Sequence, residues 1–154
     1  MTKARNARLS PIQAGIAGEY FVAAELTRRG YVASITLRNT RGIDILASNV
    51  DATKSVGIQV KTSQGAVAVW MMSKKAEADL AANLYYIFVS LPSEAAPAYH
   101  VVPRSVVATF VRQSHAQWLA TPGKRGQAHR DNDLRQFLDS ANEYKDRWEL
   151  LGLD

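Results

Sequence analysis

Four residues in the first 61 positions have the types and the order needed for a metal site that acts on phosphate esters. Glu19 and Asp44 carry carboxylates, Gln59 carries an amide oxygen and Lys61 an ammonium group. Mg²⁺ prefers oxygen ligands and keeps several waters. In such a site Asp44 would be the principal ligand, with the Gln59 side chain, the Val60 backbone carbonyl and Glu19 as further oxygens. Lys61 would hold the attacking water or neutralise charge that develops on the phosphate.

Strand alternation can bring three of these side chains together. Residues 43–47 and 56–62 both have the pattern of strands, separated by a polar loop at 48–55. Successive side chains of a strand point to opposite faces, so Gln59 and Lys61 share a face. If the two strands pair as a hairpin across that loop, Asp44 lies beside them at one strand end.

A helix over residues 10–29 is expected to supply Glu19. Ser10 suits the N-cap, Pro11 the first helical position and Gly30 the C-terminal stop. At 100° per residue, one apolar stripe forms, and Glu19 falls inside it; the stripe consists of Ile12, Ile16, Tyr20, Ala23 and Leu26. A carboxylate on a buried stripe is costly unless another group satisfies it. Glu19 therefore requires a functional or a structural partner.

The rest of the chain predicts a mixed α/β sheet. Further strands are expected at 31–38, 66–72, 84–91 and 98–102, and helices at 74–82 and 103–118. Apolar residues at helical spacing, among them Leu134 and Phe137, predict a helical tail over 134–151 that includes a short helix around Trp148. The fold class is therefore α/β, a mixed sheet flanked by helices with a helical C-terminal extension.

Composition excludes several classes of site. The chain has 154 residues, the length of one domain, and no cysteine, which excludes disulfides, thiolate metal sites and a cysteine nucleophile. We expect residues 1–111 to form the core and residues 112–154 to form a basic loop and cap of the same domain. The absence of cysteine, of a long apolar run and of a secretory signal predicts a cytoplasmic protein with no membrane partner.

Positive charge indicates where a polyanion would bind. The net charge is +5, and residues 1–61 hold nine Lys/Arg against four Asp/Glu, whereas the remainder is balanced. A flexible-looking basic loop spans 121–131. We expect DNA phosphates to contact this loop and the basic residues near the second strand: Arg38, Arg41, Lys124, Arg125, His129 and Arg130.

The order of these residues resembles the PD-(D/E)XK nuclease superfamily, in particular its small prokaryotic members similar to archaeal Holliday-junction resolvases. The resemblance covers about residues 12–65 and rests on Glu19, on Gly42-x-Asp44 and on Gln59-x-Lys61. It implies a restriction-endonuclease-like α-β-β-β-α-β core, Mg²⁺ or Mn²⁺ held at Asp44 and Gln59, a supporting acid at Glu19 and a catalytic lysine at Lys61. It also implies a homodimer that cuts DNA.

Two departures from the family pattern keep an alternative open. No proline precedes Asp44, and Gln59 stands where the family usually has an acid. An amide has no charge and binds Mg²⁺ less well than a carboxylate does. The alternatives are an inactive nuclease-fold module that binds nucleic acid or a protein, and a domain without a nucleic-acid partner. In either case Glu19 would be a structural partner of Lys61 or Arg41. We predict a metal-dependent DNA nuclease.

Overall fold

The computed structural model describes residues 8–37, 42–78 and 81–154 of the chain. Helix α1 (Pro11–Arg28) is followed by three antiparallel strands, β1 (Val32–Ile35), β2 (Ile45–Ser48) and β3 (Ser55–Ser63). Strand β4 (Val69–Ser73) and the 3₁₀ helix η1 (Lys74–Glu77) lead to β5 (Leu84–Ser90) and β6 (Ala98–Pro103). Helix α2 (Arg104–Ala120), β7 (Leu134–Leu138) and the 3₁₀ helix η2 (Trp148–Leu151) complete the chain.

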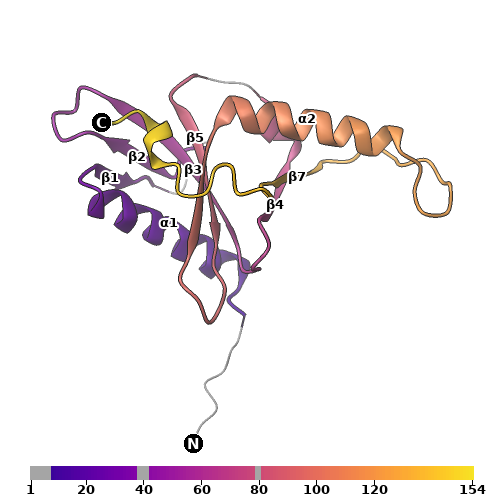
Figure 1. Cartoon of the computed structure of the whole chain (residues 1–154), viewed down its shortest axis with the longest axis horizontal. Helices are drawn as coiled ribbons and strands as arrows, with labels where there is room; N and C mark the ends of the chain where they lie inside the picture. The colour runs from indigo at the N-terminus through magenta and orange to yellow at the C-terminus, as the bar shows by residue number, and fades with distance from the viewer. Residues whose placement is uncertain (1–7, 38–41, 79–80) are drawn as a thin grey trace, which may run out of the picture.

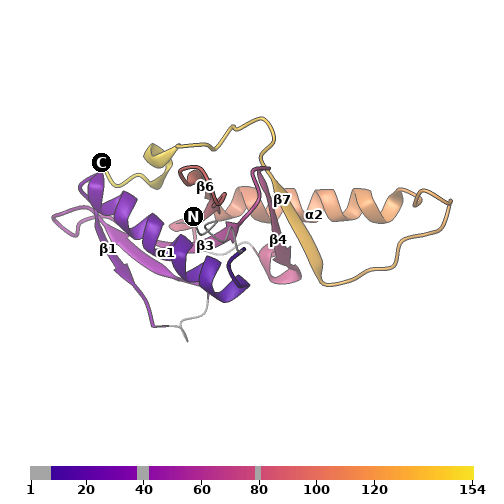
Figure 2. The same ribbon diagram turned by 90° about the horizontal axis from the view of Figure 1, so that it is seen from below.

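Five strands form the main sheet in the order β1-β2-β3-β5-β6, with β3 and β5 parallel and all other neighbours antiparallel. Strands β4 and β7 form a separate antiparallel pair. Figure 1 shows α1 near β1, β2 and β3, whereas α2 extends away from the sheet and carries a loop at its far end. Figure 2 shows β4 and β7 beside α2. The mixed sheet flanked by helices is the predicted fold class.

Two apolar clusters lie on opposite faces of the main sheet. One joins α1 to the face that carries Ile45, Ile58 and Val89, and η2 closes it with Trp148. The other lies under β4, β7 and α2 and holds an aromatic group that includes Trp70, Phe88 and Phe137. The rings of Phe88 and Phe137 stack at 4.5 Å between centroids, so β7 is held against the central strand by aromatic packing as well as by its pairing with β4.

Two expected helices differ from the structure. Of the helix expected at 74–82, the described residues form only the short η1 at 74–77, and the chain reaches β5 from β3 by way of β4. Residues 134–138 were expected to be helical but form strand β7, in which Arg135 and Phe137 are buried and the residues between them are exposed. This alternation is the strand period, which a short apolar run does not separate from a helical one. Only the turn around Trp148 is helical, as η2.

The buried face of α1 also differs from the expected stripe. Ile12 and Tyr20 are 68% and 64% exposed, and the buried line is Ala14, Gly18, Val22 and Leu26. The first two residues of this line, Ala14 and Gly18, are small, and α1 lies very close to β3 at Gly18. A methyl group added at Gly18 would lie 1.9 Å from Thr62 Oγ1, far inside van der Waals contact. The helix limits match the expectation, since Ser10 and Gln13 form a capping box and Pro11 begins the helix.

Candidate functional site

Asp44 lies at the point where the chain enters β2, and four hydrogen bonds fix it. Gly42 precedes it with a positive φ of 66°, a conformation that favours glycine. The Asp44 N–H donates to the Ile58 carbonyl at 2.8 Å, and its own carbonyl accepts from the N–H of Thr36 at 2.9 Å and from its hydroxyl at 3.3 Å. Its carboxylate oxygen Oδ2 accepts from the Val60 N–H at 2.7 Å. The carboxylate is therefore held in one orientation by the backbone of β3.

Glu19 and Asp44 line the same surface hollow, of about 280 Å³. The first turns of α1 and the end of β1 form its walls, which consist of Pro11, Ile12, Gly15, Ile16, Thr36 and Leu37. Both carboxylates are half-buried. The close contact between Gly18 and Thr62 sets the position of Glu19, because it fixes the distance between α1 and β3 one residue away. The structure thus brings two of the four candidate residues into one concave site.

The backbone of Val60 in β3 points toward Asp44. In a β-strand the N–H and the carbonyl of one residue point to the same side, and the Val60 N–H points to Asp44. The Val60 carbonyl therefore also points toward the β2 side, where the sequence expectation requires it. The remaining carboxylate lone pairs of Asp44 and this carbonyl are oxygen donors of the kind that a hard cation prefers.

Gln59 and Lys61 share a face, as alternation predicts, but α1 covers the other one. Ile58 and Val60 belong to the cluster under α1, so Gln59 and Lys61 point to the opposite side. Their register partners on β5 are Tyr86 and Phe88, which belong to the second cluster. Neither Gln59 nor Lys61 lines the hollow of Glu19 and Asp44. The sheet therefore separates Glu19 from Gln59 and Lys61, and Asp44 lies at the end of β2.

The turn at Gly42 links Gln59 to a residue that sequence reasoning missed. A methyl group added at Gly42 would lie 3.9 Å from Gln59 Oε1 and 3.7 Å from Arg104 Nη1. Arg104 is the first residue of α2 and is only 8% exposed. Its guanidinium carbon lies 5.4 Å from the centroid of the Tyr86 ring. The sequence gives no signal for Arg104, because an arginine at the start of a helix is usually exposed.

The pKa of Tyr86 responds to the charges of Arg104 and Asp44. Burial raises the pKa of this phenol, the positive charge of Arg104 lowers that pKa, and the negative charge of Asp44 raises it. Asp44 and Arg104 therefore both lie close enough to Tyr86 to act on it, although they reach it from different elements. These interactions place a carboxylate and a guanidinium around one end of β3 and β5.

The predicted DNA-contact residues lie elsewhere. Lys124, Arg125 and Arg130 are exposed on the loop at the far end of α2, away from α1 (Figure 1). The ring of His129 stacks on Trp118 at 4.1 Å, which ties the loop back to the helix. Arg38 and Arg41 lie outside the described residues.

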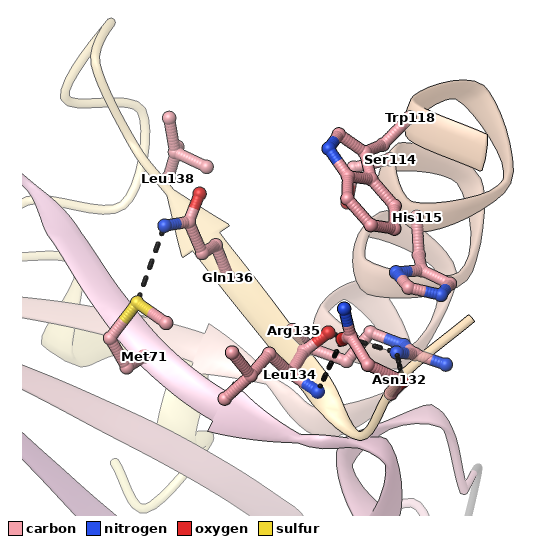
Figure 3. Close-up of a pocket in the computed structure, with 9 residues that line it drawn as sticks. All are labelled: Met71, Ser114, His115, Trp118, Asn132, Leu134, Arg135, Gln136 and Leu138. Carbon is pink, nitrogen blue, oxygen red and sulfur yellow. Dashed lines mark hydrogen bonds between the residues drawn. The ribbon is translucent and has the colours of Figure 1, made fainter. Parts of the chain in front are cut away.

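A second hollow, of about 260 Å³, lies between α2 and the β4–β7 pair (Figure 3). Met71, Leu134, Leu138 and Trp118 give it apolar walls. Its buried cation, Arg135, is already paired with Glu77, at 2.5 Å between Nε and Oε1. The remaining lining residues are Ser114, His115, Asn132 and Gln136. His115 Nε2 lies 2.8 Å from Asp131 Oδ1, and this hydrogen bond lowers the pKa of Asp131. The titratable groups here are engaged with one another.

Over residues 8–37, 42–78 and 81–154, no three His, Cys, Asp or Glu side chains are grouped so that they could hold a metal ion. A metal at Glu19 and Asp44 would therefore take its remaining ligands from water or from a neutral protein oxygen such as the Val60 carbonyl. Within the same ranges, no helix is long and apolar enough to cross a membrane.

Two solved structures share this architecture. The Holliday junction resolvase Hjc of Archaeoglobus fulgidus, an archaeal hyperthermophile, superposes with a TM-score of 0.52 at 17% identity. The alignment covers 91% of this chain and 97% of that one. The bacterial homing endonuclease I-Ssp6803I superposes with a TM-score of 0.58 at 10% identity, over 94% of this chain and 92% of that one.

The chain shares its fold with these two nucleases. At these identities the likeness establishes the fold alone. No protein-family model matches the sequence, and no curated protein matches it. The shared fold extends over nearly the whole chain, whereas the resemblance noted in the sequence covers about residues 12–65.

Proposed function

We propose that the chain is a divalent-metal-dependent nuclease that hydrolyses phosphodiester bonds of DNA. The observation that carries the proposal is the joint hollow of Glu19 and Asp44 in a fold shared with a junction resolvase and a homing endonuclease. The hollow gathers the carboxylate oxygens of two acidic side chains at one concave position. A hard divalent cation is the partner that best fits their chemistry.

The oxygen donors present fit Mg²⁺ or Mn²⁺. Asp44 and Glu19 would hold the ion, with the Val60 carbonyl, which points to the same side as the N–H bound to Asp44, as a neutral donor. The Gln59 amide oxygen lies near Gly42, two residues before Asp44, and would reach the ion only from the opposite face of the sheet. When bound, the ion supplies Lewis-acid polarisation of the phosphate and a water of lowered pKa. The Val60 N–H holds Asp44 Oδ2, which orients the carboxylate before the metal or the substrate arrives.

Lys61 has the role of the cation at the reacting phosphate. It lies two residues beyond Gln59 on the same face of β3, so one strand carries both a neutral oxygen donor and an ammonium. An ammonium in this place would orient the attacking water or balance charge that forms on the phosphate. Lys61 faces away from the hollow of Glu19. The substrate would therefore have to contact both faces of the sheet, around the end of β2 at Asp44.

An inactive binding module is the second candidate, and one observation favours it. Gln59 and Lys61 are separated by the sheet from Glu19, so the four residues do not line a single hollow. A chain that had lost catalysis could keep Asp44 and Glu19 for structural reasons. In that case it would bind DNA without cutting it, and metal would not alter its stability.

The test is cleavage of supercoiled, linear and branched DNA with Mg²⁺, with Mn²⁺ and with EDTA. We expect metal-dependent cutting that Asp44→Asn and Lys61→Ala both abolish. Matched controls are Asp51→Asn and Lys75→Ala, which remove the same charges from exposed positions and should leave cutting unchanged. Wild-type protein that binds DNA but cuts none of the three substrates with either metal would support the binding module instead.

The homodimer stays a prediction. A dimer would carry two sites, as cutting both strands of a duplex requires. Light scattering combined with gel filtration measures the mass directly. A mass of about twice 17.0 kDa supports the dimer, and a mass of 17.0 kDa at micromolar protein contradicts it.

A further inference from the structure

Arg104 is a buried cation whose charge the described structure leaves uncompensated. Its Nε donates a long hydrogen bond of 3.4 Å to the Ala78 carbonyl, and its guanidinium lies over the Tyr86 ring. Among the described residues, no carboxylate forms an ion pair with it. A cation removed from water without an anion is costly, so such groups are usually paired or bind an anionic ligand.

The other buried arginine shows the contrast. Arg135 is 4% exposed and is fully engaged, because Glu77 accepts from its Nε and two backbone carbonyls, of Asn132 and Leu134, accept from Nη1. Arg104 is buried almost as deeply but has one weak hydrogen bond and a ring contact. Among the described residues, Arg135 has a carboxylate and two carbonyls as acceptors, whereas Arg104 has one carbonyl and no carboxylate.

The position of Arg104 points to the candidate site. Its Nη1 and Gln59 Oε1 both lie within 4 Å of the point where a side chain at Gly42 would begin. Gly42 lies two residues before Asp44, and it has no side chain that would lie between the turn and these two polar groups. Tyr86, which is in register with Gln59, interacts electrostatically with both Asp44 and Arg104.

The charge balance of the site indicates what Arg104 would bind. Glu19 and Asp44 carry two negative charges, Gln59 carries none and Lys61 carries one positive charge. Hydrolysis of a phosphodiester adds a second negative charge to the phosphate, which a cation in addition to Lys61 would balance. A guanidinium presents a planar fork of N–H donors that matches two phosphate oxygens.

We propose that Arg104 binds the phosphate group of the substrate at the Asp44 end of the sheet, as a further residue of this site. The inference rests on the proposed function, since a phosphodiester is the ligand that the nuclease would bring there. Arg104 supplies the positive charge for the phosphate, and it does so beside Gly42, which has no side chain to stand between them. A purely structural role would instead have Arg104 support Tyr86 through the ring contact.

The two roles predict opposite effects on metal binding. If Arg104 only supports the fold, Arg104→Met loosens the site and weakens binding of Mn²⁺. If Arg104 contributes its charge to the site, the same substitution removes a repelling cation and tightens Mn²⁺ binding. The expected gain is about fourfold for one charge roughly 10 Å from the ion in a water-like dielectric.

The experiment compares wild type, Arg104→Met, Arg104→Lys and the control Arg112→Met by isothermal titration. Arg112 lies on the same helix and is exposed, so its loss should change nothing. In the first arm, inorganic phosphate is titrated in EDTA. We expect wild type and Arg112→Met to bind, and Arg104→Met to lose about tenfold or more in affinity, the effect of one hydrogen bond to a charged group. In the second arm, Mn²⁺ is titrated, with Asp44→Asn as a further variant.

The two arms separate the inference from the proposed function. Phosphate binding that both Arg104 variants keep at wild-type strength, or that wild type lacks, overturns the role of Arg104 whatever the metal does. Weaker Mn²⁺ binding by Arg104→Met overturns it also. Mn²⁺ binding that Asp44→Asn does not change contradicts the metal site, with no bearing on the phosphate arm. If Arg104→Met fails to fold, Arg104→Lys decides alone: it keeps the charge and lacks the fork, so wild-type phosphate affinity overturns the proposal and a loss supports it.

Discussion

Replacing Gly18 by alanine tests whether the close approach of α1 to β3 positions the site. The added methyl group would lie 1.9 Å from Thr62 Oγ1 and 3.1 Å from Thr62 Cβ, so part of the helix or the strand must move. Overpacking of this kind costs about 1–3 kcal/mol of unfolding free energy. The gain in helix propensity from Gly to Ala offsets up to about 1 kcal/mol of that cost.

Gly15 provides the matched control, because it lies on the same helix and nothing comes within 4 Å of an added methyl group there. Gly15→Ala should stabilise the protein by about 0.5–1 kcal/mol. The propensity gain is common to both variants, so we expect them to differ by the overpacking cost, about 1–3 kcal/mol, in urea unfolding followed by the fluorescence of the buried Trp70 and Trp148. Equal stability of the two variants would refute the close contact.

A second substitution identifies the atom responsible. Thr62 Oγ1 is buried and has no hydrogen-bond partner within the described part of the chain, so its removal should cost little. Thr62→Ala should rescue part of the loss in Gly18→Ala, with a coupling energy of about 1 kcal/mol or more. Thr62→Ser keeps the hydroxyl and should not rescue. Equal rescue by both substitutions would contradict the argument. Because Gly18 adjoins Glu19 and Thr62 adjoins Lys61, Gly18→Ala should also slow cleavage where the protein remains folded.

Three further predictions concern other parts of the molecule. Asp139 is buried and accepts from two backbone N–H groups and pairs with His100 Nδ1 at 2.6 Å, so Asp139→Ala should lower the unfolding free energy by about 3 kcal/mol in urea. A loss below about 1 kcal/mol would contradict this. The hydrogen bond from Tyr31 to Asp154, at 2.5 Å, raises the pKa of the phenol to about 12, and Asp154→Asn should lower that value in a spectrophotometric titration. The folded pKa lies above the ordinary tyrosine value of about 10, so this stabilisation is complete below about pH 10 and is lost as pH rises through about 12. An unchanged titration would count against the bond. Lys124→Ala should reduce the slope of log affinity for DNA against log salt by about 1, and an unchanged slope would remove Lys124 from the interface.

The strands and the limits of α1 were predictable because their signals are local. Strand alternation in residues 56–62 placed Gln59 and Lys61 on one face, and the run 84–90 is the buried central strand β5. The serine cap and Pro11 fixed the start of α1. The prediction that Glu19 and Asp44 share a site depended on the resemblance to a nuclease fold as much as on local pattern.

The features that the sequence did not reveal depend on distant contacts. Strand β7 pairs with β4, about 65 positions earlier in the chain, and that pairing decides between strand and helix for the segment 134–138. The buried face of α1 follows Gly18 rather than the larger Ile12 and Tyr20, because close packing on β3 selects small residues. Local sequence does not decide which face of β3 is covered by α1. That choice places Gln59 and Lys61 on the face opposite Glu19, and it depends on how the helix and the sheet are connected. Arg104 gave no signal because its burial arises only in the fold.

The most direct test of the central claim is the position of Mn²⁺ in a crystal of the protein, located by its anomalous scattering. We predict one strong peak between Glu19 and Asp44, at a coordination distance of about 2.0–2.2 Å from an Asp44 carboxylate oxygen. The same peak should be absent from crystals of Asp44→Asn. An ordered, ion-free pair of carboxylates in a protein that nevertheless cuts DNA with Mn²⁺ would contradict the account, as would a peak held by other residues.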